Sequence, residues 1–223
     1  MHNPVDTYFV HLLFGSDSAF LDSFALTVTN AWLWVPLYIA LCLLIIKNHD
    51  NMQQIFVCVG CAILGVLLAT GLTSIVTKPL FERLRPCNDP EFKYLADIAG
   101  NIHNKDFSFF SSHAATSMAI VSFFCLLVRN WFFSFSMILW SLIVCWTRLY
   151  LGQHFFTDVL VGILWGNITG ILSYLLYWRY TNRIINKSYH ISEKFTSGGI
   201  SKFDVDVVLL VLFVSFLYAL IPI

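Results

Sequence analysis

Charged side chains are scarce in this chain of 223 residues. Asp, Glu, Lys and Arg make up 12% of it, and 13 basic residues balance 13 acidic ones. This balance excludes a nucleic-acid partner held by an excess of positive charge. The first 30 residues contain no Lys or Arg, so the positively charged start of a cleaved signal peptide is missing and we expect the chain to be mature as written.

The chain also lacks features that divide or cross-link a protein. It has no linker rich in Gly, Ser or Pro and no evident internal repeat, which predicts a single domain over residues 1–223. Cys58 and Cys61 form one Cys-x-x-Cys pair, but no second pair follows at the spacing of a zinc site. We therefore interpret the cysteines as small apolar residues, and expect neither a metal ion nor another cofactor.

Apolar residues are abundant: 58% of the chain is hydrophobic, with a mean hydropathy of +0.74. A soluble domain of this length cannot bury so much apolar surface. Crossing a bilayer takes about 20 mostly apolar residues as a helix. The sequence therefore predicts an all-α fold, a six-transmembrane helical bundle. The six runs are 25–46, 55–77, 112–128, 131–147, 155–178 and 205–223.

The distribution of Lys and Arg among the loops predicts the orientation. Loops 47–54, 129–130 and 179–204 hold seven of these residues, so the positive-inside rule places them in the cytoplasm. The long loop 78–111 and the turn 148–154 then lie at the extracytoplasmic membrane face.

Residues 1–24 include a stretch with the pattern of an interfacial helix. Phe9, Leu12, Leu13 and Phe20 provide apolar side chains that would enter the headgroup region.

The first polar cluster stands where the second apolar run ends. Lys78 and Arg85 are seven residues apart, so a helix through this stretch would project both from one face and end at Pro86. An ammonium and a planar guanidinium together suit an anion with several oxygens, such as phosphate. A basic flank that snorkels to the membrane boundary is the alternative.

The second cluster begins the third apolar run. Ser111 and Ser112 occupy a helix N-cap, where free N–H groups and the helix dipole favour an anion. His113 follows as a candidate general acid. An ordinary N-cap beside an interfacial histidine is the alternative.

The third cluster leads into the fifth run. His154 and Asp158 are spaced i and i+4, so they would share a helix face, and the carboxylate would fix the histidine tautomer. The free imidazole nitrogen could then act as a nucleophile. Arg148 precedes a break at Gly152 and can turn toward the same anion. A capping Asp with a structural His is the alternative.

Together the three clusters resemble the type 2 phosphatidic acid phosphatase (PAP2) superfamily, here a bacterial membrane lipid phosphatase. Its signature reads K-x6-RP, then PSGH, then SR-x5-H-x3-D, and the spacing matches from Lys78 to Asp158. Phe110 and Ser112 replace the expected Pro and Gly, and Thr147 replaces Ser. These departures leave every ionisable position filled but put substrate fit in doubt.

The resemblance implies a role for each matched residue. His154 attacks phosphorus and forms a phosphohistidine, which Asp158 orients and stabilises. His113 protonates the leaving oxygen and then activates water. A neutral His154 and a protonated His113 predict a bell-shaped pH profile. The implied phosphate-binding residues are Lys78, Arg85, Arg148, Ser111 and Ser112. These cations would make the reaction metal-independent.

The implied substrate is a lipid phosphate in the bilayer, and no obligate protein partner is implied. We rank undecaprenyl diphosphate first, lipid A phosphate second, and phosphatidylglycerol phosphate or phosphatidic acid after them. The expected location is the bacterial inner membrane, with the active site facing the periplasm or exterior. Loop 87–110 is the candidate lid or specificity element.

Three other interpretations carry weight. A vanadium-dependent haloperoxidase has a similar site, but those enzymes are soluble. A catalytically inactive lipid-binding or transport protein of the same fold would explain Phe110 and Ser112. A metal site of His103, His113 and His154 has no supporting spacing.

Overall fold

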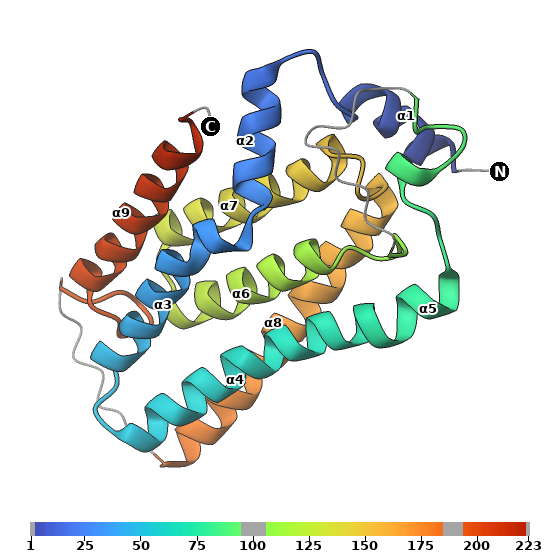
Figure 1. The fold of residues 1–223 in the computed structure, drawn as a ribbon. Helices are drawn as coiled ribbons and strands as arrows, with labels where there is room; N and C mark the ends of the chain where they lie inside the picture. The colour runs from blue at the N-terminus through green and yellow to red at the C-terminus, as the bar shows by residue number, and fades with distance from the viewer. Residues whose placement is uncertain (1–2, 95–105, 185–193, 222–223) are drawn as a thin grey trace.

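The computed structural model describes residues 3–94, 106–184 and 194–221, and this part of the chain is helical (Figure 1). It contains one isolated β-bridge, between Phe195 and Ser201, and no strand, so the all-α prediction is confirmed for the described residues. The long helices are α1 (Pro4–Leu13), α2 (Ala19–Thr29), α3 (Val35–Lys47), α4 (Met52–Gly71), α6 (Ser112–Val128), α7 (Trp131–Tyr150), α8 (Phe156–Ile184) and α9 (Lys202–Ala219). The short helical segments are η1 (Ala31–Trp34), the π-helical η2 (Leu72–Thr77), α5 (Lys78–Phe81) and η3 (Pro86–Asn88).

A helix is present in each of the six predicted apolar runs, but not every helix could cross a bilayer alone. Within the described residues, the segments containing α4, α7 and α8 are long and apolar enough, and α2 with α3 adds a fourth if that bent pair is one span. Helix α6 has only 17 residues. The chain is thus an all-helical protein with three or four candidate spans, and six spans remain a prediction.

The first predicted span is not one continuous helix. The chain bends by 62° between α2 and the segment formed by η1 and α3. Asn30 stands at the bend, and its side-chain oxygen accepts a hydrogen bond from the Trp32 backbone N–H at 3.1 Å. An Asn side chain that bonds nearby backbone competes with helix continuation, so the run 25–46 is divided there.

Helix α8 packs on α6 along a row of glycines. A Cβ atom on Gly162 would lie 2.7 Å from the Ser111 carbonyl oxygen, and one on Gly166 would lie 2.3 Å from that of Ala115. Only glycine allows backbones to approach this closely, as in membrane helix pairs with small residues four apart. This contact fixes the start of α6 against the start of α8, which brings the second and third clusters together.

The loops sort to two ends of the bundle. At one, which we call the opposite end, Lys47 Nζ lies 3.2 Å from Asp204 Oδ1, and His49 Nε2 lies 2.8 Å from the Tyr177 hydroxyl. These contacts join the loop after α3 to α8 and α9. The sequence likewise predicts that loops 47–54 and 179–204 lie at the same end of the bundle. The other end, the site end, holds α1, the segment after α5, and the starts of α6 and α8 (Figure 1). Which end faces the cytoplasm remains a prediction.

Candidate active site

The stretch from Lys78 to Arg85 is not one continuous helix, contrary to the prediction, because α5 covers only Lys78–Phe81. Proline at position 79 lacks the N–H that a regular helix needs and crowds the preceding turn, where the backbone is π-helical. The helix ends at Phe81, and Glu82 follows with φ 44° in the left-handed region. Arg85 is extended, so an irregular segment, not one helix face, carries it toward the site.

The start of α6 confirms part of the second prediction. Ser111 is the N-cap, and its hydroxyl accepts a hydrogen bond from the Ala114 N–H at 3.4 Å. Its own N–H donates to the Asp158 carbonyl at 3.1 Å, which ties α6 to α8. The His113 side chain is exposed on the first turn. The Phe110 side chain, where the signature has Pro, is buried and packs in an apolar cluster.

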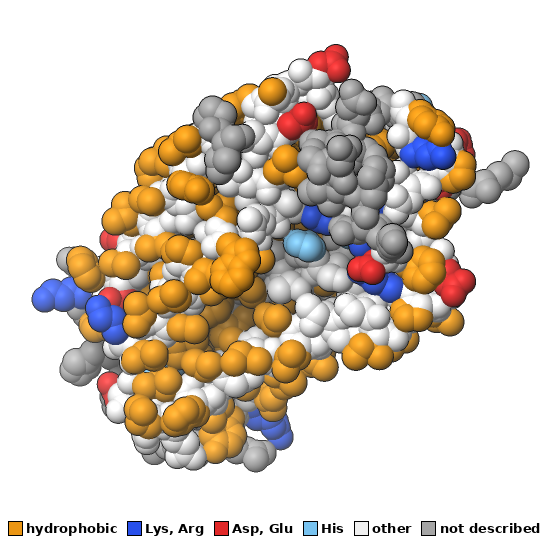
Figure 2. Space-filling model, viewed as in Figure 1, with side chains coloured by type: hydrophobic (Ala, Val, Ile, Leu, Met, Phe, Trp, Pro, Cys, Tyr) orange, Lys and Arg blue, Asp and Glu red, His pale blue; other side chains and the backbone are white. Residues whose placement is uncertain are grey.

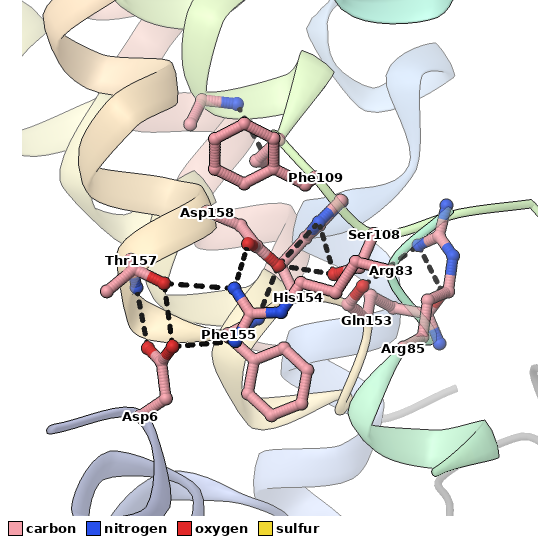
Figure 3. Close-up of polar contacts among 12 residues, drawn as sticks. Asp6, Arg83, Arg85, Ser108, Phe109, Gln153, His154, Phe155, Thr157 and Asp158 are labelled. Carbon is pink, nitrogen blue, oxygen red and sulfur yellow. Dashed lines mark hydrogen bonds and ion pairs between the residues drawn. The ribbon is translucent and has the colours of Figure 1, made fainter. Parts of the chain in front are cut away.

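His154 and Asp158 are close, but not through a shared helix face. Helix α8 begins at Phe156, so His154 lies in the preceding turn and Asp158 in the first helical turn. His154 Nδ1 is 3.9 Å from Asp158 Oδ2, too far for a direct hydrogen bond. The Ser108 hydroxyl is 3.5 Å from Nδ1 and donates a short hydrogen bond to Asp158 Oδ2. Ser108 thus lies against both groups (Figure 3).

The Asp158 carboxylate has further partners. Arg83 Nη1 donates to Oδ1 at 2.6 Å, and the Phe155 backbone N–H donates to Oδ2 at 3.0 Å. The Arg83 guanidinium also stacks 4.0 Å above the Phe155 ring. These contacts compensate a fully buried carboxylate and fix its orientation.

A second buried carboxylate, Asp6 on α1, joins this group. Arg83 Nη2 donates to Asp6 Oδ2 at 2.7 Å. The Thr157 backbone N–H donates to Asp6 Oδ1 at 2.9 Å, and the Thr157 hydroxyl donates to Oδ2 at 2.7 Å. Asp6 therefore caps α8 from another helix, as Figure 3 shows.

Two buried guanidinium groups lie near His154. Arg85, 3% exposed, donates from Nε to the Asp106 carbonyl at 2.8 Å and from Nη1 to the backbone and side-chain oxygens of Gln153. Arg148, 6% exposed in the last turn of α7, donates a short hydrogen bond from Nη1 to the Thr29 hydroxyl. Within the described residues, Arg148 Nε and Ser112 Oγ are buried without a hydrogen-bond partner.

Burial sets the charge state of His154. The side chain is 2% exposed, and removal from water lowers its pKa to about 4, with the Arg148 and Arg85 charges acting in the same direction and contact with Asp158 opposing them. His154 is therefore neutral at pH 7, the state in which a ring nitrogen can act as a nucleophile.

The structure brings the sequence-predicted residues together. The charges of Lys78, Arg85 and Arg148 all act on His113, as does His154. His113 is exposed and Lys78 is half-buried, so these two mark the open side of the group. Figure 2 shows Lys and Arg atoms beside an exposed histidine, next to a hollow with apolar walls.

A cavity of about 260 Å³ begins beside the site. Its polar wall includes Ser112 and His113, and its apolar wall includes Trp34, Tyr38 and Trp140. An amphiphile could place a polar group near His113 and an apolar group between α3 and α7.

Three residues of this group were not predicted from the sequence. Arg83 is a third cation in the first cluster, Ser108 precedes the second, and Asp6 is a carboxylate within the otherwise apolar Pro4–Leu13. An acidic residue on an apolar helix was the available signal for Asp6. Residues 95–105 of the predicted lid, including His103, lie outside the described part of the chain.

Comparisons with known proteins identify the family of the chain. The model of the PAP2 superfamily matches residues 59–182. A lipid A 4'-phosphatase of Bacteroides thetaiotaomicron is 32% identical over 82% of this chain and 81% of its own length, and one of Porphyromonas gingivalis is 31% identical over 78% and 73%.

A solved transmembrane PAP2-type phosphatidylglycerolphosphate phosphatase from Bacillus subtilis covers 81% of this chain and 94% of its own, with 19% identity. Its TM-score of 0.36 is too low to support an argument. The family match spans more than half of the chain and includes Lys78, His113, Arg148 and His154. The chain therefore belongs to the PAP2 superfamily.

Proposed function

We propose that this protein is a multi-pass bacterial membrane phosphatase that removes phosphate from lipid A through a phosphohistidine on His154. One observation carries the chemistry: a buried, neutral imidazole lies beside the Asp158 carboxylate, and the Arg85 and Arg148 guanidinium groups are close enough for their charges to act on it. Phosphoryl transfer mostly requires positioning and charge stabilisation, and this arrangement supplies both.

The contacts of His154 identify the attacking atom. Nδ1 faces Ser108 and Asp158, which favours the tautomer with the proton on Nδ1. Nε2 then keeps its lone pair and attacks phosphorus, while the bond to the leaving lipid oxygen breaks. Asp158 stabilises the positive charge that the ring acquires in the phosphohistidine.

Cations hold the non-bridging oxygens in the transition state. Lys78, Arg85 and Arg148 offset the phosphate charge without a metal ion. The buried Arg148 Nε and Ser112 Oγ have no partner among the described residues, so they are donors that phosphate oxygens can engage. Ser112, which departs from the family glycine, thus adds a hydroxyl to the site.

His113 acts as the general acid and then as the base. It is exposed on the open side of the group, where the leaving oxygen of a lipid would lie. It protonates that oxygen, and after the lipid departs it takes a proton from the water that hydrolyses the phosphohistidine. The substrate enters from this side because His154 and the arginines are buried.

Lipid A replaces undecaprenyl diphosphate as the preferred substrate. Two similar proteins, each matched over more than two thirds of its length, are lipid A 4'-phosphatases, which supports the alternative that we ranked second. We place the protein in the inner membrane, with the site end facing the periplasm. The filled positions at His113, His154 and Asp158 count against an inactive lipid-binding protein.

Phosphate release by the purified protein tests this proposal. The panel is lipid A, undecaprenyl diphosphate, phosphatidylglycerol phosphate and phosphatidic acid, each with and without EDTA. We expect the highest kcat/KM with lipid A, no effect of EDTA, and an acid-labile phosphoprotein in a rapid quench. His154→Gln should abolish release and labelling, whereas His49→Gln, at the opposite end, should keep both.

Two results would refute the proposal. Preference for another lipid by tenfold or more would exclude lipid A as the substrate. Labelling that persists in His154→Gln would exclude this histidine as the nucleophile.

A further inference from the structure

A row of alternating charges leads from α1 to the proposed nucleophile. Asp6 contacts Arg83, Arg83 contacts Asp158, and Asp158 lies beside His154 (Figure 3). Both carboxylate side chains are buried, at 1% and 0% exposure, and the Arg83 side chain is 24% exposed. Charges in such surroundings interact strongly because little water screens them.

We propose that Asp6 is a positioning residue for the reaction, which acts through Arg83 to keep Asp158 available to His154. This inference rests on the proposed function, because it assigns Asp6 a part in activating the same nucleophile. Asp6 belongs to α1, outside the three signature clusters and outside the family match over residues 59–182.

Arg83 and His154 compete for the charge of the Asp158 carboxylate. Arg83 approaches Oδ1 at 2.6 Å, so a guanidinium with no other partner would draw the carboxylate charge toward itself. The acceptor strength left for Ser108 and His154 at Oδ2 would then fall. Asp6 binds the other terminal nitrogen of Arg83 at 2.7 Å and offsets its charge. Asp158 therefore keeps a larger share of its negative charge for the imidazole.

The same contacts fix the geometry. Asp6 accepts from the Thr157 N–H, one residue before Asp158, so it holds the first turn of α8 as well as Arg83. Thr157 also accepts from Arg83 Nη1 at 3.0 Å. Rotation of the Asp158 carboxylate away from His154 would break its hydrogen bonds to Arg83 and to the Phe155 N–H.

The groups facing His154 come from several elements. Asp158 and Ser108 lie on the Nδ1 side, and the charges of Arg85 and Arg148 also act on the ring, which in turn interacts with His113. Asp6 offsets the charge of Arg83, which binds Asp158 at Oδ1, the carboxylate oxygen that does not face the His154 ring. Removal of the Asp6 charge should therefore change the population of the His154 tautomer that carries the proton on Nδ1. The phosphate-binding residues should stay in place.

The test compares two variants of α1. Asp6→Asn removes the charge and keeps an oxygen for the Thr157 N–H. Val10→Ala loosens the packing of α1 in the cluster that contains Phe155, but removes no charge. Spectra of the ring nitrogens of ¹⁵N-histidine-labelled protein, with the His154 signals assigned by their loss in His154→Gln, report the tautomer without any turnover.

We expect a lower Nδ1–H population in Asp6→Asn and an unchanged one in Val10→Ala. With lipid A, kcat should fall by about 10-fold in Asp6→Asn while KM stays within about twofold, because a transition-state interaction is lost. An unchanged ring spectrum in Asp6→Asn would overturn the proposal, and so would an equal spectral change in Val10→Ala.

A double-mutant cycle tests whether Asp6 acts through Arg83. If it does, adding Asp6→Asn to Arg83→Gln should cause little further loss of kcat. If the two substitutions instead lower kcat by independent factors that multiply in the double variant, Asp6 does not act through Arg83. If the wild-type protein releases no phosphate from lipid A, the proposed function fails, whereas the ring spectra still decide the role of Asp6.

Discussion

The two ends of the bundle differ in how far their paired charged side chains are exposed. At the opposite end, Lys47 and Asp204 form an ion pair in which the lysine side chain is 61% exposed. At the site end, Asp6 and Asp158 share Arg83 with almost no exposure of either carboxylate. A surface pair adds little stability, while burial of charge is costly and each buried member needs a partner. Charge retained inside an apolar bundle therefore indicates chemistry rather than stability.

Loss of a buried cation should have the largest effect on activity. Arg148→Met removes an unpartnered donor and a charge from the phosphate side, and we expect kcat/KM for lipid A to fall about 10³-fold. Lys47→Met is the matched control at the opposite end and should stay within twofold of the wild type. Retention of a tenth of the activity in Arg148→Met would contradict the assignment of this residue.

The glycine contact between α6 and α8 should dominate stability. In Gly166→Leu, the first side-chain atom alone would meet the Ala115 carbonyl at 2.3 Å, so we expect destabilisation of about 1–3 kcal/mol and separation of His113 from His154. In Gly60→Leu, on α4, the added Cβ would meet no described atom within 4 Å outside its own stretch of helix. Unfolding curves in detergent should therefore differ between the two variants, and equal curves would show that this contact is not tight.

The pH dependence should reveal the burial of His154. Attack requires the neutral imidazole, so kcat/KM is lost as the pH falls through the pKa of this group. Because burial lowers that pKa to about 4 from 6.5, the acid limb should lie well below pH 6. Measurement of kcat/KM from pH 4 to 8 in buffers that preserve the fold checks this. An acid limb at 6.5 would indicate that water reaches His154 freely.

The smallest effect should come from the surface pair itself. Asp204→Asn should change the free energy of unfolding by about 1 kcal/mol or less, and less still at high salt. Phosphate release should be unaffected. A large loss of activity would show that the two ends are coupled.

Local patterns in the sequence predicted most of the helices and selected candidate site residues that the structure brings close together. Apolar runs locate the helices α3, α4, α6, α7, α8 and α9 but not α1, and the spacing from Arg148 through His154 to Asp158 identified the third cluster. These inferences succeed because a membrane leaves the backbone few alternatives and because ionisable residues stand out in apolar surroundings.

Contacts between distant segments were not predictable in the same way. Asp6 and Arg83 are 77 residues apart, and no periodicity relates them. The left-handed conformation of Glu82 was also not predicted from the sequence. It ends α5 at Phe81, and that end depends on how Pro79 is accommodated one turn earlier. Likewise, Asn30 divides the first run through a side-chain bond that apolar content does not reveal.

The glycine row on α8 also limits how this protein can diverge. Each added residue turns a helix by roughly 100°, so a single insertion between Gly162 and Gly166 would point one of the two away from α6. A side chain would then be forced between the two backbones. Substitutions at exposed positions of α8 can accumulate freely, but the length of chain between His154 and Gly166 cannot change by one residue.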